Sequence, residues 1–553
     1  MVAAASLCLA QTAHSATITP TVFFDGMAVT GNCTLREAVQ ASNANAAVDA
    51  CEAGQANKLD TIELSAGEYN LTIDGSSESE NETGDLDVRP EMGSGPLRIR
   101  GEGIGVTTID AEHDDRVIEL YNLNVEGSLT LSDLTALGND DRVTSGGVIF
   151  SNRAELVVQR VEVANGHAQF GGGIACGTCD RMRITNSLVH DNRATVSGTG
   201  SPGVQSRGGG ISAADTDVVI SNTTVTDNEA VTNDSIAVGG GIYGRGAVEI
   251  RGSFVANNTT RSSTNNAIST RAGGGVYIGS SDEPSVAKIS NTTMSGNSAS
   301  SNGAQSQGGA VAVRHETALN VFGATLSDNT ASQGQEIHAR DGALANVAGS
   351  ILASIGNGQV CAQDGGTIRS KGYNVLDSQP PLAAACMDGP KSTKDEVAEP
   401  NISFVPSDNG GPTFTFVIAD TSPAVNLVPK SKCGPAAKAD QRGVERPIGK
   451  GCDAGSYERA KCAGSLLEEE AIFGTAGKDK LTGTPGEDVF APSAGKDKLK
   501  GGGDADNICG GSGDDTLKGG NGEDALDGGN GSDVCDGGPG PDSGKSCEKK
   551  KSL

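Results

Sequence analysis

Short runs of alternating apolar and polar residues recur through the middle of the chain. Each run begins with Ile or Val, alternates over the next six residues, and closes on an Asn. This alternation, with its enrichment in Thr, Val and Ile, predicts half-buried β-strands rather than helices. The five clearest runs are residues 184–192, 220–228, 250–258, 289–297 and 321–329.

A Gly-Gly-(Gly/Ala)-apolar signature precedes each run, at Gly171, Gly208, Gly239, Gly273 and Gly308. The period of 30–39 residues lies in the range of solenoid repeats. Because the connections are too short for a helix, the repeat predicts a parallel β-helix. We expect it to run continuously over residues 59–352, with residues 345–352 as its final coil. Length varies between each Asn and the next glycine signature, which predicts polar loops on one side.

The closing asparagines share one repeat position, so stacking of the coils would place them in a column. We expect their amides to bond along this column and to turn carbonyls. The residues are Asn192, Asn228, Asn258, Asn297 and Asn329.

The C-terminal segment has a second, shorter period. Residues 474–545 divide into eight blocks of nine without an insertion, and the sixth position of every block is Asp. Glycines around each Asp permit turns that aim backbone carbonyls inward, and stacked carboxylates would surround a hard divalent cation. The eighth position is apolar in the first six blocks, from Leu481 to Leu526. These side chains predict a narrow core. The predicted metal ligands are Asp479, Asp488, Asp497, Asp506, Asp515, Asp524, Asp533 and Asp542.

This nonapeptide resembles the calcium-binding repeat of RTX proteins. The resemblance implies a β-roll with two blocks per turn, Ca²⁺ as the cofactor, and at most about six sites between blocks two apart. The first three blocks, with Thr475, Thr484 and Ser493 at position two, fit the pattern less well. The last block lacks its core residue, having Gly544, and is interpreted as a cap. Without calcium we expect the segment to be disordered, since its carboxylates repel.

The N-terminus and the cysteines indicate an oxidising compartment. Residues 1–16 are similar to the end of a secretory signal peptide, and removing Cys8 with them leaves twelve cysteines, an even number. We predict disulfides Cys33–Cys51 and Cys433–Cys452. Neighbouring cysteines elsewhere suggest further sequential pairs, although spacing alone does not fix the connectivity. These pairs are Cys176 with Cys179, Cys361 with Cys386, and Cys535 with Cys547.

Three segments carry family resemblances. Residues 33–38, Cys-Thr-Leu-Arg-Glu-Ala, followed by Cys51 and by 60–64, resemble the entry of the bacterial family named for its Cys-Ser-Leu-Arg-Glu-Ala motif. The glycine repeats are similar to chlamydial polymorphic outer-membrane proteins. Residues 440–447 and 451–458 resemble the choice-of-anchor module that closes many β-helices. These resemblances imply a secreted or surface-associated, adhesin-like β-helix, and they bring no assigned reaction.

Composition narrows the class of partner. The formal net charge is −28, which argues against nucleic acid and favours hard cations. Aromatics are 3% of residues and Trp is absent, which argues weakly against sugar-stacking grooves. No segment after the N-terminus reaches the roughly 18–20 apolar residues of a membrane span.

Catalysis has only weak candidates, and no catalytic residue is predicted. Lyases on β-helices need an Arg or Lys base beside acidic calcium ligands, and hydrolases need paired carboxylates. No HExxH, GxSxG or P-loop motif occurs. The weak candidates are Asp110, His113, Asp114, Asp115, Arg116 and the pair Arg181 and Arg183.

The predicted fold is all-β: a right-handed parallel β-helix, then a small closing module and a C-terminal calcium-binding β-roll. The predicted function is non-catalytic adhesion to a surface glycan or matrix polymer by a secreted, calcium-binding protein. The alternative is a polysaccharide lyase or glycoside hydrolase acting on acidic polysaccharide. The predicted divisions are 1–16 signal peptide, 17–57 entry segment, 58–348 β-helix, 349–460 last coils and closing module, and 461–553 roll.

Overall fold

The structure is a computed structural model of the full chain. It describes residues 15–553 except 76–79, 90–94, 113–114, 122–126, 140–142, 197–204, 234, 263–270, 280–283, 302–304, 355–357, 379–386, 388–393, 434–437, 448–449, 460, 463–464, 467–470, 473, 475–476 and 492. Most of the predicted signal peptide and the candidates His113 and Asp114 therefore lie outside the described residues.

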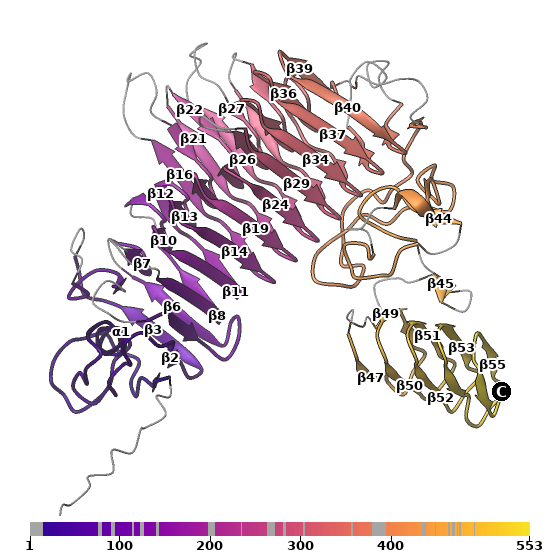
Figure 1. Ribbon diagram of the computed structural model, residues 1–553, viewed down its shortest axis with the longest axis horizontal. Coiled ribbons are helices and arrows are strands. Elements are labelled where there is room, and N and C mark those ends of the chain that lie inside the picture. The colour runs from indigo at the N-terminus through magenta and orange to yellow at the C-terminus, as the bar shows by residue number, and fades with distance from the viewer. Residues whose placement is uncertain are drawn as a thin grey trace, which may run out of the picture.

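Parallel strands stack coil upon coil along one axis to form a right-handed β-helix (Figure 1). One large sheet forms two of its walls. Its strands are β1 (Thr17–Ile18), β2 (Asp60–Glu63), β3 (Gly67–Leu71), β5 (Leu97–Arg100), β6 (Thr107–Ala111), β8 (Ser128–Leu137), β11 (Glu155–Ala164), β14 (Arg181–Thr185), β15 (Leu188–His190), β19 (Asp217–Ser221), β20 (Thr224–Thr226), β24 (Val248–Arg251), β25 (Phe254–Ala256), β29 (Val286–Ser290), β30 (Thr293–Ser295), β34 (Ala318–Phe322), β35 (Thr325–Ser327), β37 (Leu344–Ala348), β38 (Ile351–Leu352), β40 (Thr367–Gly372), β41 (Val375–Leu376) and β42 (Glu396–Val397).

Two ten-stranded sheets form the remaining walls. The second sheet follows the glycine signatures and contains β4 (Leu86–Val88), β7 (Ile118–Tyr121), β10 (Ile149–Asn152), β13 (Ile174–Gly177), β18 (Ile211–Ala214), β23 (Ile242–Arg245), β28 (Val276–Gly279), β33 (Val311–Val313), β36 (Ile337–Arg340) and β39 (Cys361–Asp364). The third sheet contains β9 (Val143–Ser145), β12 (His167–Phe170), β16 (Arg193–Val196), β17 (Gln205–Arg207), β21 (Glu229–Thr232), β22 (Ile236–Val238), β26 (Thr259–Ser262), β27 (Arg271–Ala272), β31 (Ser298–Ser300) and β32 (Ser306–Gln307).

Neighbouring strands pair in the register that the sequence repeat predicted. Ile184, Ile220, Ile250 and Ile289 are aligned on neighbouring strands, and all four are buried. Alternation therefore places one residue of each pair in the narrow core and the next on the surface. The corner before each closing strand needs a left-handed backbone, and Asn, which tolerates it, alternates there with Gly: φ is 50° at Asn186 and 58° at Gly252.

The predicted asparagine column is confirmed. The side-chain amide of each Asn donates to the Oδ1 of the Asn one coil later, at 2.8–3.0 Å. The same Oδ1 also accepts the backbone N–H of the earlier Asn at 2.9–3.2 Å. Each amide also bonds a carbonyl of the preceding coil, as Asn258 does with Val225 at 2.8 Å. All five asparagines are buried, so the column satisfies corner groups that water cannot reach.

Glu336 continues the column after its last Asn. It occupies the third position of the glycine signature, where Ala310 lies one coil earlier. Asn329 donates to its Oε2 at 2.6 Å, as each earlier Asn donates to the next. Burial raises the pKa of Glu336 well above its usual range. A buried acid thus replaces the amide that the sequence no longer supplies.

The β-helix extends beyond its predicted final coil. Residues 345–352 were expected to be its final coil, whereas the division at 349–460 allowed for further ones. The strands β39, β40 and β41 form one more coil, in register with β36, β37 and β38. The strand β42 then pairs with β41. The sequence repeat did not reveal this coil, because it lacks the glycine signature and the closing Asn. Only its apolar positions follow the repeat.

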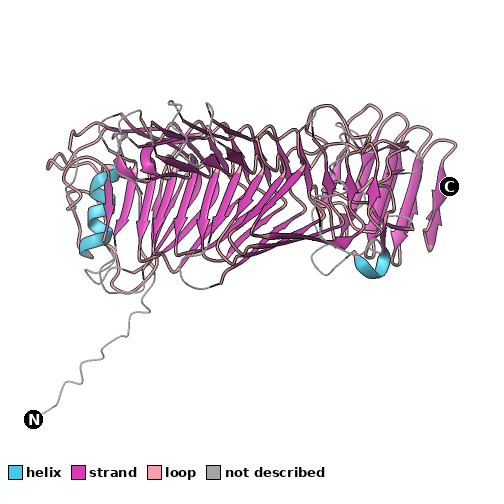
Figure 2. Ribbon diagram, turned by 90° about the horizontal axis from the view of Figure 1, so that it is seen from above, coloured by secondary structure: helices cyan, strands magenta, loops and turns pink. Residues whose placement is uncertain are grey.

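The N-terminal end of the β-helix is covered by a helix, α1 (Leu35–Ala44), as Figure 2 shows. Thr34 and Glu37 form a capping box at its start, and the Cys33–Cys51 disulfide is present as predicted. Arg36 is fully buried, pairs with Asp25 at 2.8 Å, and donates to the carbonyls of Gly84 and Asp85 at 2.7 Å. The residues of the 33–38 motif thus have structural roles at the end of the stack.

The closing segment packs against the large sheet. It contains β43 (Val428–Pro429), β44 (Gly451–Cys452), a 3₁₀ turn at Lys430–Lys432, and the predicted Cys433–Cys452 disulfide. Gln441 accepts a hydrogen bond from Thr293 at 2.7 Å, which fastens the segment to β30. Arg442 and Asp440 form a fully buried pair at 2.8 Å inside it. A short hairpin follows, of β45 (Lys461–Cys462) and β46 (Ser465–Leu466).

The tail is a β-roll of two parallel five-stranded sheets, at the C-terminal end of the chain in Figure 1. Partner residues are 18 apart, for example Leu499 and Leu517, so two nonapeptides make one turn as expected. The predicted eighth positions form the core, and Cys535 extends it by one block. One sheet contains β47 (Lys480–Thr482), β50 (Lys498–Gly502), β52 (Thr516–Gly520), β54 (Val534–Asp536) and β56 (Lys549–Lys551). The other contains β48 (Val489–Phe490), β49 (Ser493–Ala494), β51 (Asn507–Ser512), β53 (Ala525–Asn530) and β55 (Ser543–Lys545).

Candidate metal centre

The eight predicted Asp residues form two columns, one along each edge of the roll. One column holds Asp479, Asp497, Asp515 and Asp533, and the other holds Asp488, Asp506, Asp524 and Asp542. In every step of both columns the backbone N–H of one Asp donates to Oδ1 of the Asp one turn later, at 2.8–2.9 Å. The six steps share this bond, but Oδ2 of Asp488 in the second block also accepts hydrogen bonds from the backbone N–H and the hydroxyl of Thr484, at 2.6 and 3.1 Å. The threonine at position two therefore occupies an oxygen that is left without a partner in the later blocks.

In the last five blocks the other carboxylate oxygen lies buried between turns. Oδ2 of Asp506, Asp515, Asp524, Asp533 and Asp542 receives no hydrogen bond. Burial of a carboxylate oxygen without a hydrogen-bond partner costs free energy, because the oxygen loses its hydration and forms no bond that replaces it. These atoms are thus suited to bind a cation.

A backbone carbonyl oxygen from the next turn lies beside each of these Oδ2 atoms, and a glycine leaves the space between the two oxygens empty. A Cβ on Gly501 would lie 2.0 Å from Oδ2 of Asp506 and 2.6 Å from the Gly519 carbonyl oxygen. Gly519 has the same relation to Asp524 and the Gly537 carbonyl, at 2.1 and 2.5 Å. Any side chain at position one of these blocks would fill the space between carboxylate and carbonyl.

The columns carry an electrostatic cost. Burial, with a smaller contribution from neighbouring aspartates, raises the pKa of Asp506 and of Asp515 to about 6. The pKa values of Asp524 and Asp533 are raised for the same principal reason. A divalent cation at each step would remove this cost. Anionic and carbonyl oxygens without nitrogen or sulfur ligands are the donor set of calcium, so the residues present fit that ion.

Two disulfides hold the roll. Cys535 and Cys547 are bonded, as their proximity in sequence suggested, and so are Cys176 and Cys179 in the β-helix. Cys462 and Cys509 are also bonded, which spacing did not predict because 47 residues separate them. The predicted partner of Cys361, Cys386, lies outside the described residues.

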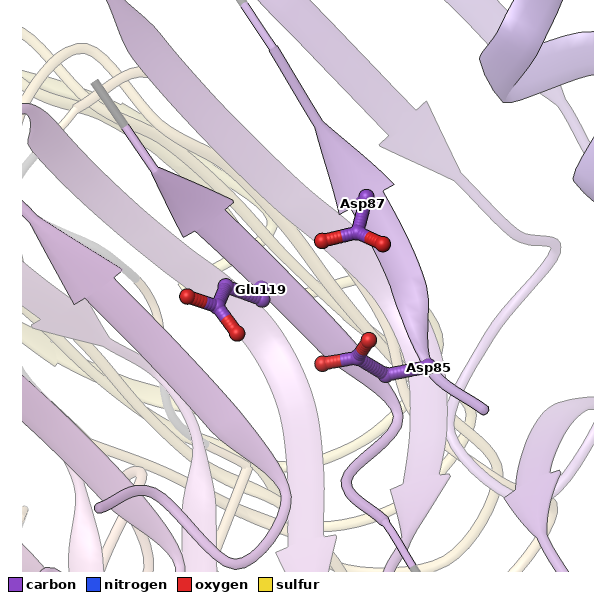
Figure 3. Close-up of side chains that lie close together, drawn as sticks. All are labelled: Asp85, Asp87 and Glu119. Atoms are coloured by element: carbon purple, nitrogen blue, oxygen red, sulfur yellow. The ribbon is translucent and has the colours of Figure 1, made fainter. Parts of the chain in front are cut away.

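A separate acidic cluster lies on the second sheet near the N-terminal end (Figure 3). Asp87 of β4 is in register with Glu119 of β7, and Asp85 precedes β4. Carboxylate oxygens of the three lie within 4.8 Å of one another, and Asp85 and Asp87 are buried. Burial raises the pKa of Asp85 well above its usual range, and Arg116 opposes this effect.

Two of the sequence candidates for catalysis belong to this cluster. Arg116 bonds Glu119 at 2.7 Å and lies 3.5 Å from Asp85 and 3.3 Å from Asp115. With Arg89, 4.0 Å from Asp87, two guanidinium groups face four carboxylates. Folding thus brings Asp115 and Arg116 close to Asp85 and Asp87, about thirty residues earlier in the sequence.

The other described candidates lie apart from it. Asp110 is on β6 in the large sheet, where burial raises its pKa. Arg181 and Arg183 lie on β14 and line a shallow groove of about 360 Å³ with residues that include Glu249 and Lys288.

A larger groove lies between the β-helix and the closing segment. Its volume is about 700 Å³, and Phe254, Phe404 and Phe414 line it. Phe404 is 99% exposed and Phe414 47%. Polar side chains, among them Asp227 and Asp328, complete the lining. Although the chain has only 11 phenylalanines, folding brings three to one place.

Comparison with known proteins identifies the tail. The model of the RTX calcium-binding nonapeptide repeat matches residues 470–499, 493–517 and 510–543. The tail carries RTX repeats. These repeats bind calcium, so calcium is the cofactor that the chain carries sites for, and they are typical of extracellular proteins.

Two solved structures resemble the chain at low similarity. They are the PL6 family alginate lyase AlyGC and an arginine-to-alanine mutant of it, at 11% and 12% identity and TM-scores of 0.27 and 0.28. Each match covers 88% of this chain and 70% of the other. This likeness is too distant to bear on function.

No curated protein sequence matches the chain. Within the described part of the chain, no helix has the length and apolarity needed to cross a membrane.

Proposed function

We propose that the protein is a secreted or surface-associated β-helix whose RTX tail folds on calcium, and that the eight aspartates are the metal ligands. The observation that carries the ligand assignment is that the last five aspartates have a buried Oδ2 without a hydrogen bond, each beside a carbonyl of the next turn. The first three are assigned because they occupy the same position in the same columns. We also propose that the entry segment ends at residue 57, the main part of the β-helix at residue 348, and the last coils with the closing module at residue 460.

Substitution of single aspartates tests the assignment. Asp515 takes part in two steps of its column and Asp479, at the end, in one. Asp515→Ala should raise the calcium concentration needed to fold the roll, measured by circular dichroism, more than Asp479→Ala does. Asp514→Ala, an exposed neighbour, is the control. Equal effects of all three substitutions would contradict the ligand assignment.

We further propose that the protein adheres to a glycan or matrix polymer without cleaving it, and that the 700 Å³ groove is the contact site. Three phenylalanine rings and two carboxylates support this, because aromatic faces cover the apolar face of a sugar while carboxylates accept from its hydroxyls. The three rings offset the weak argument against sugar binding drawn from composition.

A glycan array with the calcium-loaded protein tests the adhesion proposal. Phe404→Ala should reduce binding about tenfold without loss of stability, since this side chain is almost fully exposed. Phe24→Ala removes another exposed Phe, outside the groove lining, and should leave binding unchanged. Binding that survives Phe404→Ala and Phe414→Ala together would exclude the groove.

A lyase or hydrolase for acidic polysaccharide is the second candidate function. It is favoured by one observation, the cluster in which Arg116 lies among Asp85, Asp115 and Glu119. An arginine beside acids is the combination that β-elimination of a uronate requires. The test is incubation with a panel of uronate polymers, reading unsaturated product and reducing ends.

Turnover would establish an enzyme and exclude the non-catalytic proposal. Arg116→Ala should then abolish activity, whereas Arg160→Ala, in an exposed ion pair with Asp133, should not. Loss of activity in both variants would exclude the cluster as its source.

A further inference from the structure

The C-terminal end of the roll contains one more acid in the position of a repeat Asp. The backbone N–H of Asp533 donates to Oε2 of Glu548 at 2.6 Å. Each of the six steps between aspartates is built on the same bond, from the N–H of one acid to the carboxylate of the acid one turn on. Glu548 therefore occupies the next place in the column of Asp479, Asp497, Asp515 and Asp533.

Strand pairing supports this placement independently. The strand β56 is parallel to β54, and Val534, the residue after Asp533, is in register with Lys549, the residue after Glu548. The step is 15 residues rather than 18, so the chain reaches the same position after a turn three residues shorter. The Cys535–Cys547 disulfide joins β54 to the residue before Glu548.

The remaining donors of a calcium site are also present at this step. Oδ2 of Asp533 is buried and receives no hydrogen bond. A Cβ on Gly528 would lie 2.7 Å from this atom and 2.1 Å from the Ser546 carbonyl oxygen. In the steps before it, a glycine carbonyl holds the place of Ser546. Two of the nearby lysines bond elsewhere: Lys550 to the Gly544 carbonyl and Lys551 to Asp536.

We propose that Asp533 and Glu548 flank a seventh calcium site, which closes the roll and is not part of the nonapeptide pattern. This inference rests on calcium binding by the roll. A longer glutamate side chain compensates for the shortened turn, and binding of the ion would fix β56 to β54. The chain beyond Lys545 is thus a functional end of the roll.

The test counts bound ions on the full-length, disulfide-intact protein by native mass spectrometry in calcium. Glu548→Gln should bind one ion fewer than the wild type. Glu523→Gln, the same change at an exposed residue of the roll, should bind as many as the wild type. An unchanged count in Glu548→Gln would overturn the proposal. A wild type that binds no calcium would instead refute the proposed function of the whole roll.

Hydrogen exchange on the wild type covers the case in which Glu548→Gln unfolds the roll and loses several ions. With calcium bound, the amide of Lys549, which donates to the Asp533 carbonyl at 3.0 Å, should be protected as strongly as that of Val534, which donates to the Asp515 carbonyl. Exchange of the Lys549 amide at the rate of an unstructured peptide in saturating calcium would overturn the proposal.

Discussion

At the scale of the residue, function and stability both depend on polar side chains that recur at one position per turn. In the β-helix the recurring residue is an amide, which both donates and accepts, so a column of asparagines satisfies itself. In the roll it is a carboxylate, which only accepts. Its Oδ1 accepts a backbone N–H, while in the last five blocks Oδ2 is left without a donor. This difference is the basis for our proposal that the amide column is structural and the aspartate columns bind metal.

Replacing Asn258 by leucine tests the amide column. The change removes bonds to the Val225 and Ala256 carbonyls and to the neighbouring asparagines. We expect a loss of about 2–4 kcal/mol in the free energy of unfolding, since several buried groups lose their partners. Asn320→Leu, at a half-buried outward position, is the control and should cost little. The measurement is chemical denaturation, and equal stability of the two variants would contradict the role of the column.

At the scale of the element, each turn of the roll is too thin to be stable by apolar burial alone. One side chain per nonapeptide enters its core, from Phe490 to Cys535. Between the turns lie carboxylates whose charge opposes folding. Binding energy from calcium must supply the difference, as in small metal-dependent domains.

The pH dependence of folding tests this balance. Burial raises the pKa of Asp506 and Asp515 to about 6 in the calcium-free roll, whereas in the unfolded tail they titrate near about 4. Between these values the roll binds more protons than the unfolded tail, so its calcium-free stability is lost as pH rises through about 6. Calcium displaces these protons, and its affinity should increase over the same interval.

We therefore expect the calcium midpoint for folding, read by circular dichroism, to be higher at about pH 5 than at about pH 7. Without calcium, the tail should show more β-structure at the lower pH. A midpoint that does not vary with pH would show that these carboxyls are not displaced by calcium.

At the scale of the whole molecule, we expect a calcium-independent body to be joined to a calcium-dependent one. The β-helix has a continuous apolar core, a helical cap and its own disulfides, and its described residues bury no comparable column of charge. The roll is tied to the segment before it by Cys462–Cys509. Loss of calcium should therefore unfold one part and leave the other intact.

Limited proteolysis of the full chain tests this independence. With a calcium chelator, cleavage should be confined to residues 474–545 and leave the β-helix as a stable fragment. Fragments cut between Cys462 and Cys509 should separate only after reduction. Magnesium should protect poorly, being smaller and slow to lose its water. Cleavage within the β-helix on chelation would contradict the independence of the two parts.

The sequence by itself determined whatever repeats. A constant spacing fixes which residues stack, so the asparagine column, the two aspartate columns and the core of the roll could be predicted residue by residue. Only the tertiary structure decided the contacts between segments that do not repeat. Glu336 and Glu548 enter their columns from outside the pattern, and Cys462 meets Cys509 across 47 residues. The cluster around Arg116 and the groove at Phe404 likewise join distant segments. The physical reason is that residues at the same repeat position contact one another along the axis, so the spacing in the sequence reveals these contacts. Where the chain folds back, the contacts depend on complementary shape and charge, which leave no period in the sequence.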